Sequence, residues 1–154
     1  MEIFLGADHN GFKLKESIKK YLKNLGVNFR DLGNTVFDLR DDYPYFALKV
    51  GKQVVKTKSK GILICGSGQG VCLAANKIKG IRAALVFNKK QSQKVREELN
   101  SNILCLAGQE ISFQKAKEIV KTWLKTKFSR RKRYLRRLKE IQQIEKIAPS
   151  TNRN

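Results

Sequence analysis

The chain has 154 residues, 41% of them hydrophobic and 30% charged, which is typical of a single soluble globular domain with its own core. It contains no run of 18 apolar residues and no secretory signal at its start, so we expect neither a membrane-spanning helix nor a membrane partner. The net charge of +20 would suit a nucleic-acid-binding protein, but lysines are spread over nearly every expected helix, so we expect no nucleic-acid partner.

Five apolar segments predict short strands, and each is followed by a segment with helical spacing. The strands are expected at residues 3–7, 27–32, 61–65, 82–87 and 102–107. The helices are expected at 11–25, 43–56, 68–77, 88–99, 113–128 and 133–144. This alternation predicts a single-domain, three-layer, Rossmann-like α/β fold: a five-stranded parallel sheet with helices on both faces.

The last predicted helix is basic and has no strand after it, so it can pack on its own subunit or reach across to a partner. We expect residues 1–146 to form one domain and residues 147–154 to be a flexible tail. Three cysteines in apolar or glycine-rich surroundings predict free thiols and a cytoplasmic location.

The segment ILICGSGQGV places Cys65 where a buried strand ends and a glycine-rich turn begins. Ligands of open parallel sheets bind beyond the carboxyl ends of the strands, and residues 66–70 can expose N–H groups there. We expect a thiol in this place to have some thiolate character. The glycines favour a functional thiol over a packed core residue, whereas Cys72 and Cys105 suit the core.

Four known sites with a similar sequence pattern are excluded because required residues are missing. A dinucleotide fingerprint would need a glycine at Val71, and a Walker loop would need a Gly-Lys-Ser/Thr sequence. A cysteine phosphatase would need an arginine near residue 71 or 72, and a redox pair would need a second cysteine at Gly68. The cysteine loop is therefore none of these four sites.

Five motifs follow one another along the chain: GADHNG at 6–11, DYP at 42–44, CGSGQG at 65–70, ANKIKGIRAA at 75–84 and RYLRRL at 133–138. Together they resemble the motifs of the ribose-5-phosphate isomerase type B family, which also contains galactose-6-phosphate isomerase subunits. The resemblance runs nearly end to end. It implies an aldose–ketose isomerase that acts on a sugar phosphate and uses neither a metal nor an organic cofactor.

The resemblance also implies a role for individual residues. Cys65 would be the base that moves a proton between C2 and C1 of the sugar through a cis-enediolate, whose oxygen the loop N–H groups and Ser67 would stabilise. The implied substrate contacts are Asp8, His9, Tyr43, Gly66, Gly68, Gln69, Gly70, Leu99 and Gln109. Arg133 and Arg137, one helical turn apart, would hold the phosphate from the other subunit of a homodimer or tetramer.

Five positions depart from the family pattern. Glu98 stands where the family often has the histidine that opens the furanose ring, and it can do acid–base work or be an ordinary solvated residue. The others are Leu99 for asparagine, Gln109 for arginine, Tyr134 for histidine and Tyr45 for an acidic residue.

These departures leave three possible functions open. In the first, the chain isomerises ribose 5-phosphate and opens the ring with Glu98, His9 or water. In the second, it acts on another sugar phosphate, such as galactose 6-phosphate or allose 6-phosphate. In the third, it binds a sugar phosphate with weak turnover. We expect the first, and binding of nucleic acid through residues 130–137 is the alternative from a different class.

Overall fold

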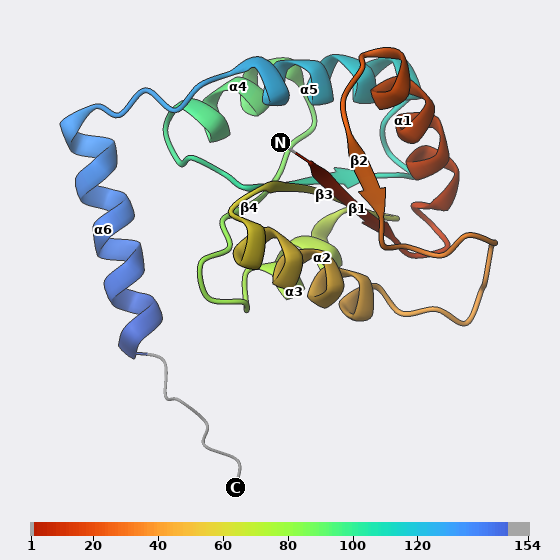
Figure 1. Cartoon of the computed structure of the whole chain (residues 1–154), viewed down its shortest axis with the longest axis horizontal. Coiled ribbons are helices and arrows are strands. Elements are labelled where there is room, and N and C mark those ends of the chain that lie inside the picture. Colours follow the sequence, from red (N-terminus) through yellow and green to blue (C-terminus); the bar gives the residue numbers. More distant parts are fainter. Residues whose placement is uncertain (1, 148–154) are drawn as a thin grey trace, which may run out of the picture.

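The computed structural model describes residues 2–147 and contains one sheet with helices on both faces (Figure 1). The strands are β1 (Ile3–Ala7), β2 (Phe29–Asp31), β3 (Lys60–Cys65), β4 (Ala83–Leu85) and β5 (Ile103–Ala107). All pairings are parallel, and the strand order is β2-β1-β3-β5-β4. The predicted α/β fold is therefore confirmed. The tail predicted for 147–154 lies outside the described residues, apart from Ile147 at the end of the last helix.

Six helices flank this sheet. They are α1 (Phe12–Asn24), α2 (Tyr43–Thr57), α3 (Gln69–Ala75), α4 (Lys89–Glu97), α5 (Phe113–Lys125) and α6 (Lys132–Ile147). Figure 1 shows α1, α4 and α5 over one face of the sheet and α2 and α3 over the other. Each face has its own hydrophobic core, one containing Ile64 and Trp123 and the other containing Leu63 and Val50. None of the described helices is long and apolar enough to cross a membrane.

The side chains of β3 alternate between these two cores, as a strand buried on both faces requires. Ile62 and Ile64 belong to the core under α1 and α5, whereas Leu63 and Cys65 belong to the core under α2 and α3. The alternation therefore directs the Cys65 thiol to the face of the sheet on which the glycine-rich turn enters α3.

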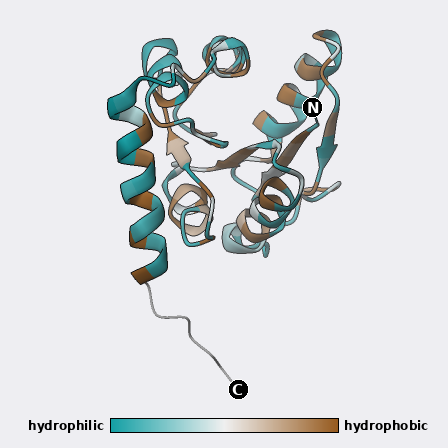
Figure 2. Ribbon diagram, turned by 60° about the vertical axis from the view of Figure 1, so that its left-hand side comes forward, coloured by the Kyte–Doolittle hydropathy of each residue, from teal (hydrophilic) through white to brown (hydrophobic). Residues whose placement is uncertain are grey.

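Helix α6 stands at the side of the layered body (Figure 1). Tyr134 is the buried residue of this helix, and the Glu145 carboxylate accepts a hydrogen bond of 3.0 Å from the Gly80 N–H group. Figure 2 shows hydrophobic bands recurring along α6. Four of its apolar residues are exposed: Leu135, Ile141, Ile144 and Ile147. The helix thus touches its own subunit and leaves several apolar side chains uncovered.

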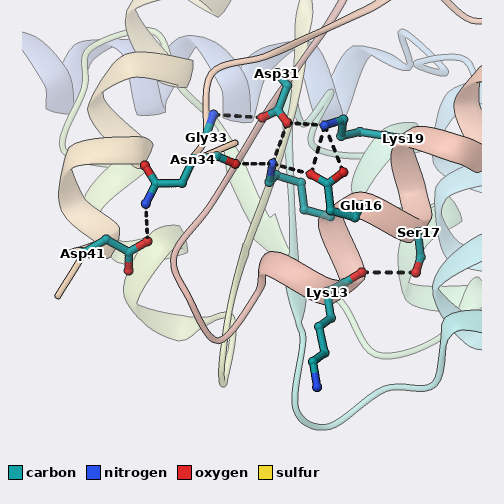
Figure 3. Close-up of polar contacts among 9 residues, drawn as sticks. Lys13, Glu16, Ser17, Lys19, Asp31, Gly33, Asn34 and Asp41 are labelled. Atoms are coloured by element: carbon teal, nitrogen blue, oxygen red, sulfur yellow. Dashed lines mark hydrogen bonds and ion pairs between the residues drawn. The ribbon is translucent and has the colours of Figure 1, made fainter. Parts of the chain in front are cut away.

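A buried lysine ties α1 to β2 and to the loop after it. Lys15 is fully buried, and its ammonium group donates to the carboxylates of Glu16 and Asp31 and to the Asn34 carbonyl. Figure 3 shows Asp31, Glu16, Lys19 and Asn34 gathered in this network. Burial alone would raise the pKa of Asp31, but hydrogen bonds from Lys15 and Lys19 lower the pKa below its usual value.

We expect Lys15→Met to lower the free energy of unfolding by about 3–5 kcal/mol at neutral pH, because it leaves the Asp31 carboxylate buried without its main partner. Since the folded-state pKa of Asp31 is lowered, this stabilisation is present above the unfolded pKa and is lost as the pH falls through the folded pKa. Urea unfolding at several pH values would measure the effect. Exposed Lys13→Met is the control on the same helix, and an equal loss in both variants would contradict the prediction.

Candidate active site

The loops that follow β1, β3 and β5 meet at one edge of the sheet. In the strand register Cys65, the last residue of β3, pairs with Ala107 at the end of β5, and Ile64 pairs with Ala7 at the end of β1. An open pocket of about 630 Å³ lies there. Its lining residues are Asp8, Asn10, Tyr43, Cys65, Gly66, Ser67, Gln69, Gly70, Leu73 and Gln109.

Most of the residues expected from the sequence are thus in one place. Cys65 is 4% exposed, so it is packed like a core residue and yet lines the pocket. Its carbonyl accepts a hydrogen bond of 2.8 Å from the Gly108 N–H group, which holds the end of β3 against the loop after β5. The thiol is therefore shielded from bulk water on the protein side and open to a ligand on the other.

The turn after Cys65 keeps backbone donors free. Within residues 2–147, the N–H groups of Gly66, Ser67 and Gly68 donate to no other protein group. Side chains would obstruct this turn: a Cβ atom on Gly66 would lie 2.8 Å from Gln109 Oε1, and one on Gly70 would lie 2.8 Å from Cζ of the Tyr43 ring. The glycines therefore bring backbone N–H groups close to the thiol, as an oxyanion-binding turn requires.

Gly68 is the tightest point of the turn. Its φ angle is +73°, and a Cβ atom there would lie 2.5 Å from Leu85 Cδ1 and 2.9 Å from the Leu106 carbonyl carbon. A side chain at position 68 would therefore cost free energy twice, through the strain of its left-handed backbone and through the clash of its Cβ atom with Leu85 and Leu106.

We expect Gly68→Ala to lower the free energy of unfolding by at least about 2 kcal/mol and to reduce turnover, because the turn must shift. Gly26→Ala is the matched control, since Gly26 has a φ angle of +67° and open space around a Cβ atom. Urea unfolding and an isomerisation assay would compare them. Equal losses of stability and turnover in the two variants would show that backbone strain alone causes the loss, contrary to the prediction.

Asp8 supplies a buried carboxyl group beside the thiol. It is 6% exposed, and its Oδ1 atom accepts a hydrogen bond of 3.0 Å from the Gly11 N–H group. Burial raises the pKa of Asp8, although the Gly11 N–H group and the neighbouring His9 oppose the rise. A carboxyl group with a raised pKa can exchange protons with a sugar hydroxyl.

Four of the expected residues lie elsewhere. Glu98 and Leu99 precede β5, whose pairing with β3 runs from Ile103 to Ala107, so they lie at the amino edge of the sheet, opposite Cys65. Exposed Arg133 donates a hydrogen bond of 2.6 Å to the Tyr134 hydroxyl. This bond and the charge of nearby Glu98 raise the pKa of the Arg133 guanidinium. Arg137 follows one turn later and is also exposed.

The sequence analysis missed three residues at or beside the pocket. Asn10 and Leu73 line the pocket, and Asp41 bonds to His9, whose ring nitrogen Nδ1 lies 2.8 Å from Asp41 Oδ1. Asn10 lies within the first motif, Asp41 directly precedes the second motif, and Leu73 follows the third. Within the described residues no group of three or more His, Cys, Asp or Glu side chains could hold a metal ion.

Comparison with known proteins identifies the family. A sequence profile of the family described as Ribose/Galactose Isomerase matches residues 3–141. The chain belongs to the Ribose/Galactose Isomerase family. This family match spans β1 to β5 and most of α6, so the open pocket and the two arginines both fall within it.

Several named relatives in the Ribose/Galactose Isomerase family cover nearly the whole chain. A probable ribose-5-phosphate isomerase B from Mycoplasma genitalium is 44% identical over 146 residues, which are 94% of this chain and 95% of the relative. The ribose-5-phosphate isomerase B of Mycobacterium tuberculosis is 34% identical over 147 residues, which are 95% of this chain and 91% of the relative.

Two solved structures have the same architecture. The ribose-5-phosphate isomerase B of Mycoplasma genitalium with bound ribulose-5-phosphate superposes with a TM-score of 0.90 at 43% identity, covering 94% of this chain and 96% of that one. The enzyme from Clostridium thermocellum gives a TM-score of 0.93 at 39% identity, covering 97% of this chain and 100% of that one.

Proposed function

We propose that this member of the isomerase family interconverts ribose 5-phosphate and ribulose 5-phosphate. The observation that carries the proposal is a buried thiol that opens onto a pocket beside three unpaired backbone N–H groups. It is supported by the Mycoplasma genitalium relative, whose structure holds ribulose-5-phosphate. Proton transfer next to a carbonyl needs a base and donors for the oxygen that becomes negative, and the pocket offers both.

In the proposed reaction, the Cys65 thiolate removes the proton from C2 of the open-chain aldose. The electron pair moves toward C1, and the carbonyl oxygen on C1 becomes an enediolate oxygen that accepts hydrogen bonds from the N–H groups of residues 66–68. The hydroxyl proton on O2 moves to O1, for which we propose the Ser67 hydroxyl and the Asp8 carboxyl on the pocket wall as carriers. Cys65 then returns its proton to C1, which yields the ketose.

The substrate phosphate needs cations that the pocket itself does not supply. Among residues 2–147, its lining contains one carboxylate and no lysine or arginine, whereas a phosphate dianion is held best by arginine forks. Exposed Arg133 lies near Glu98 at the opposite edge of the sheet, and exposed Arg137 follows one helical turn later. A twofold dimer would bring this edge of one subunit to the pocket of the other.

We therefore infer a homodimer with shared sites, and a tetramer would be a pair of such dimers. Exposed Leu135, Ile141 and Ile144 on α6 supply apolar surface for the contact. In this arrangement the partner subunit's Glu98 reaches the sugar ring, so both Glu98 and His9 are candidates for opening it. The basic segment 130–137 then serves a small phosphate ester rather than a nucleic acid.

A direct assay tests the proposal. The purified protein is expected to convert ribose 5-phosphate to ribulose 5-phosphate. The reaction is monitored by the appearance of this ketose. Galactose 6-phosphate and allose 6-phosphate are the competing substrates to compare. Faster turnover of a hexose phosphate would reassign the substrate, and the absence of turnover on all three would overturn the enzymatic proposal.

We also propose a place in the reducing cytoplasm, which the free thiols at Cys65, Cys72 and Cys105 support.

A further inference from the structure

His9 is held on one side by the loop between β2 and α2. The Asp41 carboxylate accepts a hydrogen bond of 2.9 Å from the His9 backbone N–H group and lies 2.8 Å from the ring nitrogen Nδ1. The Phe37 ring stands edge-on to the imidazole, with ring centroids 6.3 Å apart. The Asp41 side chain is 8% exposed, so the imidazole is fixed against a nearly buried carboxylate.

Asp41 is itself anchored to the fold. It accepts a hydrogen bond of 2.8 Å from the Asn34 side-chain amide, and the Asn34 carbonyl accepts one of 2.9 Å from buried Lys15. Figure 3 shows Asn34 between Asp41 and the cluster around Asp31. The carboxylate position is thus set by a network that reaches the core of α1, and not by the exposed loop alone.

On its other side, His9 is linked to the pocket. Its Nε2 atom lies 3.0 Å from the Asn10 amide nitrogen, and the Asn10 carbonyl oxygen accepts a hydrogen bond of 2.8 Å from the Gln109 side chain. Asn10 and Gln109 both line the pocket. With a neutral imidazole protonated at Nδ1, every donor of this chain points from Gln109 toward Asp41. In the imidazolium form Nε2 also donates, so the side-chain amides of Asn10 and Gln109 turn over and Asn10 Oδ1 accepts from Nε2.

We propose that Asp41 is a positioning residue for the isomerase: its carboxylate holds the His9 ring with Nδ1–H toward Asp41 and Nε2 toward Asn10 at the rim of the pocket, where the protonated ring adds a cation that the described lining residues of the same subunit lack. The proposal rests on the proposed function, because it assumes that the ligand carries a phosphate dianion. It gives a reason for a site in which neutral Gln109 stands where the family resemblance implies an arginine.

The charges around His9 support this role. The two carboxylates that face the ring are Asp41, from the loop before α2, and Asp8, from the end of β1. The hydrogen bond to Asp41 raises the pKa of His9 above its usual value, burial opposes this, and the charge of Asp8 adds to the rise. Removing the Asp41 charge should therefore lower the pKa of His9 and make the ring neutral at a lower pH.

The test uses the fact that His9 is the only histidine of the chain. We expect ¹⁵N and ¹H NMR of the free protein to show the Nδ1–H tautomer and, in Asp41→Asn, a lower His9 pKa than in wild type. Asp38→Asn is the matched control, because it removes the same charge from the same loop, where Asp38 bonds to the Arg40 N–H group instead. Equal His9 pKa values in the two variants would overturn the proposal. An Nε2–H tautomer in wild type would also overturn it, and this second measurement does not depend on how well Asp41→Asn folds.

Kinetics separate this role from a purely structural one. In Asp41→Asn, KM for ribose 5-phosphate should rise about three- to tenfold with a smaller change in kcat, and the rise in KM with pH should begin at a lower pH. An unchanged KM with a lowered kcat would overturn the proposal. Failure of wild type to turn over any sugar phosphate would overturn the proposed function, whereas the NMR titration decides the Asp41–His9 relation separately.

Discussion

Cys65→Ala is expected to abolish isomerisation and to leave the fold in place. The substitution removes the only group that we propose takes the C2 proton, and positioned general bases are worth about 10²–10⁴-fold in rate. Because the thiol lies at the rim of a core and opens onto the pocket, its loss leaves little new cavity. The measurement is kcat for the conversion of ribose 5-phosphate, with thermal unfolding recorded on the same sample.

Two further variants make this result specific. Cys72→Ala removes a partly buried thiol of α3 that does not line the pocket, and it should keep near-wild-type turnover. Cys65→Ser keeps the size of the side chain but replaces the thiol by a much weaker acid, so it should be nearly as inactive as Cys65→Ala. Substantial activity in Cys65→Ala would mean that another group, such as Asp8, removes the proton.

The central strands could be predicted closely from the sequence, because a strand buried on both faces must be apolar throughout. The residues of β1, β3 and β5 were predicted to within one residue at each end. The predictions for the edge strands were too long: β2 and β4 have three residues each instead of six. An edge strand pairs on one side only, so its length depends on its neighbour rather than on its own hydrophobicity.

The helix ends show the same limit of local patterns. The helix predicted to reach residue 128 ends at Lys125, because Thr126 takes an extended conformation. The helix predicted to reach residue 99 ends at Glu97, and Asn100 then turns with a φ angle of +47°. This second difference matters for the site, since it places Glu98 and Leu99 just beyond the end of α4.

The pocket could be predicted because parallel strands bring their carboxyl ends to one edge, so residues after β1, β3 and β5 had to meet. The same argument could have placed Glu98 at the other edge, since it comes before a strand and not after one. The pairing of His9 with Asp41 could not be predicted, because it depends on the path of residues 32–42, which contain no regular element. Hydrogen bonds from Lys15 to the Asn34 carbonyl and from the Asn34 amide to Asp41 fix two points of that path.

Mixing two inactive variants is expected to restore activity if each site is built from two subunits. Arg133→Ala/Arg137→Ala should lower kcat/KM by at least about 100-fold, because two charge-assisted contacts to the phosphate are lost. In a mixed dimer with Cys65→Ala, one pocket carries both defects. The other pocket has its own Cys65 and receives both arginines of the partner subunit.

In an equal mixture that exchanges subunits freely, half of the dimers are mixed and each has one intact site, so activity should recover to about a quarter of wild type. Mass spectrometry of intact assemblies would confirm the exchange in the same sample. Mixing Cys65→Ala with Ser67→Ala is the control, because each of these residues lines the pocket of its own subunit. Each pocket of the mixed dimer then keeps one defect, so no dimer regains an intact site. Exchange without recovery in the first mixture would mean that the arginines serve their own subunit, and α6 would then have to move from the amino edge of the sheet toward Cys65.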